Sequence, residues 1–108
     1  MDTRMKLNAL EVTQMANGHL CLNLSSTITW DCFPFFADNF LKRYNGKVLD
    51  KAESPEMRLW TVEILETIFR LVFDDYPTMV SLESSNTKGD VIVKELFVEC
   101  QDIDKGSP

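Results

Sequence analysis

Residues 56–74, EMRLWTVEILETIFRLVFD, can form either one helix or two strands, and the fold class depends on which of the two they form. Ser54-Pro55-Glu56 is typical of a helix start, with a capping residue, a proline and an acid. Against a helix, β-branched and aromatic residues are frequent, and both Trp60-x-Val62-x-Ile64 and Phe69-x-Leu71-x-Phe73 alternate with period two. A hairpin would need a turn at Leu65-Glu66-Thr67, which lacks Gly, Asn and Pro. Propensity alone leaves both structures open.

A hairpin is predicted at the start of the chain. Leu7–Thr13 is rich in strand formers, and His19–Ser25 alternates leucines with small or polar residues. Between them, Asn17-Gly18 is the pair best able to adopt the positive φ angles of a tight turn.

An amphipathic helix follows the hairpin. Thr29 or Asp31 can cap its start, Pro34 is acceptable in its first turn, and Asn45-Gly46 supplies a left-handed residue that stops it. Its apolar residues recur at spacings of three and four and form one stripe: Phe33, Phe36, Ala37, Phe40, Leu41 and Tyr44.

The last third of the chain predicts a turn, a strand and a helix. Asp74–Pro77 is a turn, Thr78–Glu83 a strand and Ser84–Asp90 a polar loop. Asp90 can cap a final helix whose core-facing residues are Ile92, Val93, Leu96, Phe97 and Cys100.

The whole chain is expected to be one domain, because 108 residues is a typical domain size. We predict a two-layer α+β fold of order ββαββββα, in which the Phe-rich helix covers one face of an antiparallel sheet and a second helix closes the chain. Residues 1–5 and 102–108 are expected to fray.

Three segments resemble a known family. These are Thr29-Trp30-Asp31-Cys32-Phe33-Pro34, Leu59–Ile64, and Phe69–Phe73 followed by Tyr76 and Val80–Glu83. Together they are similar to a family of roughly hundred-residue gammaproteobacterial proteins of unknown function, over residues 20–100. The resemblance implies an α+β fold and strands at 57–73, and it implies no activity. Where such relatives would carry a glycine between the middle strands, this chain has Leu65-Glu66-Thr67.

Charge and cysteine content limit the function classes. The net charge is −6, and residues 74–108 hold eight acids against three lysines, so this part would be repelled by nucleic acid and by anionic membranes. No apolar run approaches the length of a membrane helix, and the start predicts no secretory signal. Three cysteines without a Cys-x-x-Cys pair indicate reduced thiols and a cytoplasmic protein.

Few residues suit catalysis or metal binding. His19 is the single histidine and lies beside a turn, where we expect an exposed strand residue rather than a base. Cys21, Cys32 and Cys100 with His19 would be the only zinc set, without the close ligand pair that such sites usually have. We therefore expect small packed thiols at the sheet–helix interface, no metal, no cofactor and no enzyme.

The sequence favours a small acidic protein that acts by binding another protein, of the immunity or inhibitor type. Trp30 and Phe35 are the apolar candidates, because Phe35 falls off the helix stripe. The alternative that Phe35 packs under the opening hairpin or the loop at Ser54 stays open. The acidic candidates, which would meet a basic partner surface, are Asp74, Asp75, Glu95 and Glu99.

Two alternatives stay open. A divalent-cation-dependent enzyme or small-ligand binder would use the carboxylates of Asp74, Asp75 and Glu83. A homo-oligomeric structural module, for example a homodimer, would lose its association on Phe35→Ser.

Overall fold

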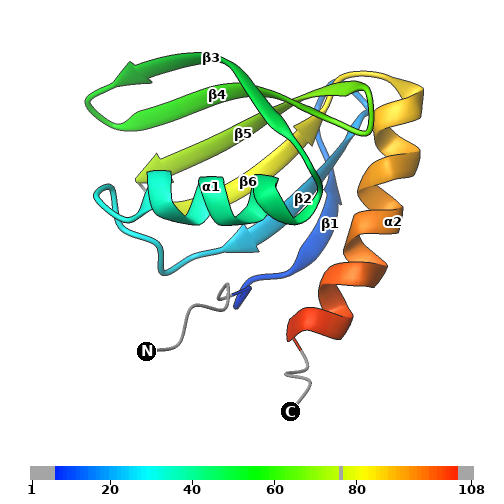
Figure 1. Ribbon diagram of the computed structural model, residues 1–108, viewed down its shortest axis with the longest axis horizontal. Helices are drawn as coiled ribbons and strands as arrows, with labels where there is room; N and C mark the ends of the chain where they lie inside the picture. Colours follow the sequence, from blue (N-terminus) through cyan, green and yellow to red (C-terminus); the bar gives the residue numbers. More distant parts are fainter. Residues whose placement is uncertain (1–6, 76, 105–108) are drawn as a thin grey trace.

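The structure, a computed structural model, describes residues 7–75 and 77–104. Its element order is ββαββββα, and the strands form one antiparallel sheet in the order β1-β2-β6-β5-β4-β3 (Figure 1). The predicted α+β class and element order are confirmed. The elements are β1 Glu11–Gln14, β2 Leu20–Ser25, α1 Phe33–Arg43, β3 Lys47–Ser54, β4 Met57–Ile64, β5 Thr67–Asp75, β6 Thr78–Ser84 and α2 Thr87–Asp104.

The ambiguous stretch forms the β4–β5 hairpin, so the helical alternative is wrong. Ile64 pairs with Thr67, which leaves Leu65 and Glu66 as a two-residue turn. Their φ angles are 52° and 61°, both positive, as the type I′ turn that suits the twist of a hairpin requires. Neither residue is glycine, and the left-handed conformation costs such residues about 1–2 kcal/mol each.

Burial explains why two strands form despite this cost. In the hairpin, the two alternating patterns place all six large side chains on the same face, whereas one helix would bury only a single stripe. Each such side chain contributes about 1.5–3 kcal/mol when fully buried, so the gain exceeds the strain of the turn. At most 1% of each of these side chains is exposed: Trp60, Val62, Ile64, Phe69, Leu71 and Phe73.

The helix-start pattern at Ser54-Pro55-Glu56 lies instead at the turn between β3 and β4. Ser54 pairs with Met57, so Pro55 and Glu56 connect the two strands. The strand β3, whose bounds were not predicted, is mostly exposed and forms one edge of the sheet.

The opening hairpin is confirmed, with a wider turn than predicted. The Met15 N–H donates to the His19 carbonyl, and the Gly18 N–H donates to the Met15 carbonyl. Gly18 has a φ of 90°, but Asn17 is not left-handed, so the connection is a three-residue loop with a glycine bulge. The strands are also shorter than predicted, since β1 begins only at Glu11.

The C-terminal end of α1 agrees with the prediction from the sequence better than its N-terminal end does. Cys32 occupies the N-cap position, and its side chain makes no capping hydrogen bond. The Cys32 N–H donates to the hydroxyl of Thr29, three residues before it. At the other end Asn45 is left-handed, and the Gly46 N–H donates to the Leu41 carbonyl, which closes the helix.

The second helix begins earlier and ends later than predicted. Asn86 caps it, because its side-chain oxygen accepts the Gly89 N–H at 2.7 Å. Asp90 is therefore not the cap: its carboxylate accepts the Leu20 N–H and contacts His19 Nδ1, both at 2.9 Å. The helix continues to Asp104, three residues into the range 102–108 expected to fray. Residues 1–5, also expected to fray, lie outside the described residues.

The predicted turn at residues 74–77 is partly strand. Asp74 and Asp75 belong to β5, where Asp74 pairs with Met79 and Asp75 pairs with Thr78. Tyr76 lies outside the described residues.

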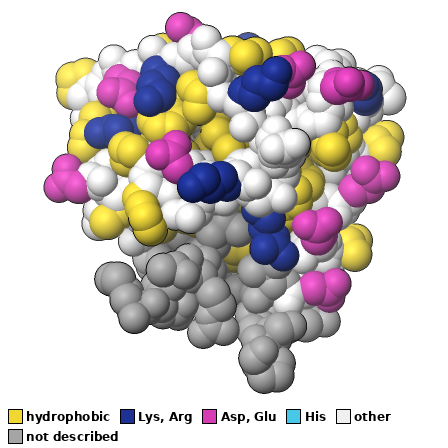
Figure 2. All heavy atoms as spheres, viewed as in Figure 1, with side chains coloured by type: hydrophobic (Ala, Val, Ile, Leu, Met, Phe, Trp, Pro, Cys, Tyr) yellow, Lys and Arg dark blue, Asp and Glu magenta, His cyan; other side chains and the backbone are white. Residues whose placement is uncertain are grey.

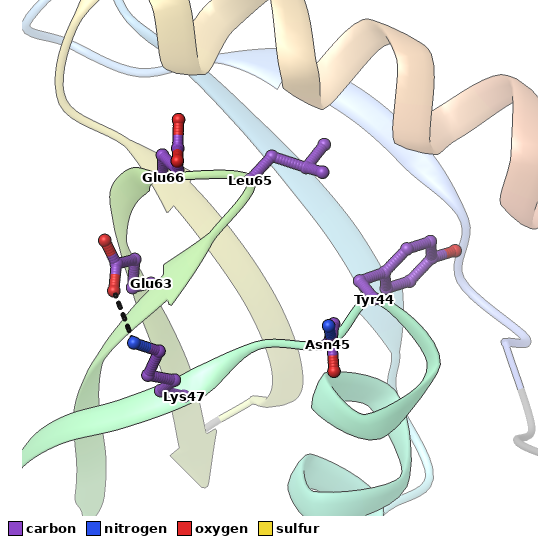
Figure 3. A pocket seen from close by; sticks show the side chains of 6 residues that line it. All are labelled: Tyr44, Asn45, Lys47, Glu63, Leu65 and Glu66. Carbon is purple, nitrogen blue, oxygen red and sulfur yellow. Dashed lines mark ion pairs between the residues drawn. The ribbon is translucent and has the colours of Figure 1, made fainter.

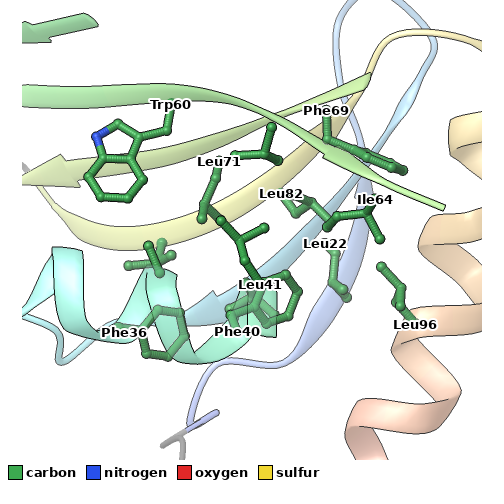
Figure 4. Packing of buried hydrophobic residues seen from close by; sticks show 14 of the residues in the cluster. Leu22, Phe36, Phe40, Leu41, Trp60, Ile64, Phe69, Leu71, Leu82 and Leu96 are labelled. Atoms are coloured by element: carbon green, nitrogen blue, oxygen red, sulfur yellow. The ribbon is translucent and has the colours of Figure 1, made fainter. Parts of the chain in front are cut away.

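Both helices contribute to a single core (Figure 4). Phe33 of α1 meets Trp60 edge-on, with ring centroids 5.0 Å apart, and also contacts Phe73. Val93 and Leu96 of α2 join the same cluster from the side of β2 and β6. The opposite face of the sheet carries the exposed side chains of Ile68 and Arg70.

The strained turn predicts a stabilising change. Replacing Leu65 with Asn and Glu66 with Gly should raise the free energy of unfolding by about 1–2 kcal/mol, because Asn-Gly adopts the type I′ conformation with little strain. Urea denaturation measures the change.

A glycine at the other two-residue turn is the matched control. Neither Pro55 nor Glu56 is left-handed, so Glu56→Gly should give no stabilisation. A destabilised Asn-Gly variant would show that the native side chains contribute more than the strain costs.

The Asp90 contacts predict a pH dependence. The hydrogen bond with His19, followed by that from the Leu20 N–H, lowers the pKa of Asp90 from 3.8 to about 2. The folded-state pKa lies below the unfolded value, so the stabilisation is present above about pH 4 and is lost as the pH falls towards 2.

Thermal melts of Asp90→Asn and the parent chain test this dependence. The variant should melt at a lower temperature at pH 7, and the difference should close between about pH 4 and pH 2. Asp102→Asn removes an exposed acid from the same helix and should not reproduce this pattern. A constant difference across the range would contradict the role of the Asp90 carboxylate.

Candidate functional site

One end of the domain brings together several of the predicted binding residues. Trp30 lies in the connection between β2 and α1, and Asp75 ends β5. Both line an open pocket of about 580 Å³, here named the Trp30 pocket. Phe35 lies in the first turn of α1, directly after this connection. The pocket is lined by Ser26, Thr27, Ile28, Thr29, Trp30, Asp31, Asp75 and Thr78.

Contacts from two strands hold the Trp30 ring in place. Its edge meets Phe73 with ring centroids 5.9 Å apart, and the Arg58 guanidinium carbon lies 4.1 Å from the Trp30 centroid. Arg58 is fixed in turn by Glu53, with Nη1 and Oε2 separated by 3.3 Å. The same Glu53 oxygen accepts the Trp60 indole N–H at 3.2 Å. The aromatic wall of the pocket is therefore preorganised.

The Trp30 pocket has an acidic, hydroxyl-rich lining. Asp31 and Asp75 are both exposed, and neither forms an ion pair within the described residues. Thr27, Thr29 and Thr78 add hydroxyl groups that can accept hydrogen bonds. These carboxylates suit a lysine or arginine side chain, with which they can form an ion pair.

Phe35 is exposed and does not pack under the opening hairpin or the loop at Ser54, the alternative that the sequence left open. Its side chain is 65% exposed, because the inward stripe of α1 is occupied by Phe33, Phe36 and Phe40. The Phe35 carbonyl accepts the Asn39 side-chain N–H, an ordinary helix contact that leaves the ring free to meet a partner.

The predicted acidic residues do not form one surface. Glu95 and Glu99 are exposed on α2, and Glu99 lies 4.0 Å from Arg43 at the end of α1. Figure 1 shows α2 at the opposite end of the sheet from the end of β5, where Asp74 and Asp75 lie. In Figure 2 acidic side chains lie along the right-hand edge of the molecule, over α2, and also at its top and left, rather than gathering at one spot.

The carboxylates considered for a cation site are also separated. Glu83 pairs with Arg70, whereas Asp74 lies opposite Met79, four positions further along β6. At about 3.3 Å per residue this separates Asp74 and Glu83 by roughly 13 Å along the strands. Within residues 7–75 and 77–104, no three His, Cys, Asp or Glu side chains are grouped as metal ligands.

The cysteines occupy three different environments. Cys100 is buried in the core, with its sulfur 3.4 Å from the Tyr44 hydroxyl, and fits the predicted packed thiol. Cys21 is also buried, but it pairs with Glu83 on the sheet face away from the helices, where burial raises the pKa of its thiol. Cys32 is exposed.

The sequence reasoning missed the contact between His19 and Asp90. We expected His19 to be exposed, yet its side chain is about one-third exposed and bonds to α2 across a separation of 71 residues. Only the placement of an acid in the first turn of the last helix hinted at a special role for Asp90.

A second pocket, of about 320 Å³, lies between the end of α1 and the β4–β5 turn (Figure 3). Glu63 of β4 and Lys47 of β3 form an ion pair at 3.7 Å along one side of it, and burial raises the pKa of the Tyr44 hydroxyl. This second pocket is lined by Tyr44, Asn45, Lys47, Glu63, Leu65 and Glu66.

Comparison with known proteins places the chain in a family. Residues 10–101 match the family described as "Protein of unknown function (DUF3630)". The chain belongs to this family. The match agrees with the resemblance of residues 20–100 to an uncharacterised family, and the gammaproteobacterial origin of that family stays a prediction. No curated protein and no solved structure matches this DUF3630 chain. Among the described helices, neither combines the length and the apolar character that crossing a membrane requires.

Substitutions of Trp30 and Phe35 should have different effects on the stability of the domain. Trp30→Ala should lower the free energy of unfolding by about 2 kcal/mol, because the ring loses its Phe73 and Arg58 contacts. Phe35→Ser should change it by less than about 0.5 kcal/mol, because the side chain is exposed. Urea denaturation measures both changes, and an equal loss in the two variants would show that Phe35 packs against the domain.

Proposed function

We propose that this DUF3630 chain is a small non-enzymatic protein that acts by binding another protein, as an immunity-type or inhibitor-type regulator. The observation that carries the proposal is the Trp30 pocket, in which an aromatic ring and two exposed carboxylates lie together; the exposed Phe35 follows in the first turn of α1. Aromatic anchors that are already fixed before binding are the residues that dominate protein interfaces.

The partner has a basic surface. The pocket carries Asp31 and Asp75 with no lysine or arginine in its lining, so a lysine or arginine side chain of the partner fits it. The net charge of −6 favours encounter with a basic protein. The same charge disfavours direct binding to nucleic acid or to an anionic membrane.

Phe35 supplies the apolar part of the interface. Asp74 lies next to Asp75 at the end of β5. Glu95 and Glu99 of α2 contribute charge at a distance rather than direct contacts, since they lie at the other end of the sheet. The sequence has three cysteines and no Cys-x-x-Cys pair, which fits the reducing environment of the cytoplasm as the place of action.

A charge-matched capture experiment tests this function. The immobilised chain is exposed to a lysate of its source cell, and the retained proteins are identified by mass spectrometry. Asp31→Asn with Asp75→Asn should reduce capture of the main partner about tenfold. Glu95→Gln with Glu99→Gln removes the same two charges from α2 and should leave capture nearly unchanged.

The salt dependence and the aromatic variant complete the experiment. Capture by the parent chain should weaken as salt screens the charges, and Phe35→Ser should weaken it without changing stability. Equal capture by the two charge-neutralised variants would place the interface elsewhere. The proposal would be contradicted if the immobilised chain retained no protein beyond what beads without the chain retain.

A further inference from the structure

The two edges of the sheet differ in length and in cover. The edge strand β1 has four residues, and α2 contacts it. The other edge strand, β3, has eight residues and pairs only with β4. A long edge presents a row of backbone N–H and C=O groups to which another strand can add.

From Asp50 to Ser54, β3 has neither an irregular register nor a lysine that projects past the edge, two features that often block pairing with another strand. An irregularity in the register falls between Val48 and Asp50, but from Asp50 to Ser54 the register with β4 is unbroken. Lysines on an edge usually block pairing by projecting a charge past it. Here the ammonium of Lys51 lies 4.3 Å from the centroid of the Trp60 ring, folded over the sheet face.

We propose that β3 pairs with the β3 strand of a second copy of this chain, antiparallel and with the two-fold axis at Ala52. Residues directly opposite each other then share a sheet face. Because the axis passes through Ala52, each residue lies opposite the one that is equally far from Ala52 in the other direction along the partner strand. Lys51 of each copy lies opposite Glu53 of the other, and Asp50 lies opposite Ser54. The small, exposed Ala52 meets its own equivalent on the axis without a clash.

Charge identifies the second copy as the occupant of this edge. The chain as a whole carries −6, so most of its surface repels a second copy. In contrast, β3 carries two lysines, one aspartate and one glutamate, and is neutral. In Figure 2, acidic and basic side chains are interspersed over the upper part of the molecule, where β3 and β4 lie. Two such strands attract each other at both Lys51–Glu53 positions.

Charge reversal with complementation tests this dimer. Light scattering of the parent chain at up to about 0.5 mM should approach twice the monomer mass of 12.4 kDa. Lys51→Glu alone and Glu53→Lys alone each place like charges opposite each other, and should weaken association about tenfold or more. An equimolar mixture of the two variants restores opposite charges at both positions, and should associate as the parent does.

Two further variants keep the test decisive. Ala52→Glu places two acids on the axis and leaves the Lys51 and Glu53 contacts with Trp60 untouched, so it should prevent association in a chain that stays folded by circular dichroism. Phe35→Ser should leave the dimer intact. A parent chain that stays monomeric up to about 0.5 mM overturns the proposal. A mixture that fails to associate, or a dimer lost on Phe35→Ser, overturns it equally.

Discussion

The register of the β4–β5 hairpin is the constraint on which the rest of the structure depends. Side chains alternate between the two faces of a strand, so a shift of one residue would move the whole apolar set of β4 and β5 to the open face. The turn at Leu65 and Glu66 fixes this register, although both residues adopt a backbone conformation that glycine tolerates better. The buried side chains on either side hold the turn in place. The core that receives both helices is built on this alternation.

The sequence predicted those elements whose signals are local and agree with one another. Repeated spacings of three and four gave α1, and alternation with an Asn-Gly pair gave the opening hairpin. The segment 56–74 carried two conflicting local signals, the Ser-Pro-Glu start and the alternation of its strands. Burial across the sheet decides between them, and this is a tertiary effect that no window of sequence contains.

The candidate site shows a similar limit. The position of Phe35 off the helix stripe left two outcomes open, exposure or packing under a neighbouring loop, and only the structure shows that the side chain is exposed. The sequence grouped Asp74 and Asp75 with Glu95 and Glu99, because all belong to the acidic last third. The sheet separates them: β5 ends beside Trp30, whereas α2 runs at the other end of the domain. The contribution of Asp31 was missed, because it lies 44 positions before Asp75 and meets it only in the folded pocket.

The strand order has a consequence for the way the chain reaches its native state. From β3 to β6 each strand pairs with the next one in sequence, so the contacts within this meander close short loops. The pairing of β2 with β6 instead joins segments about 60 residues apart, across α1 and three strands. Because closing a longer loop costs more chain entropy, the β3–β6 meander is the natural folding nucleus, and the opening hairpin docks onto it late. The Trp30 connection, which leads out of that hairpin, is therefore among the last parts of the chain to become ordered.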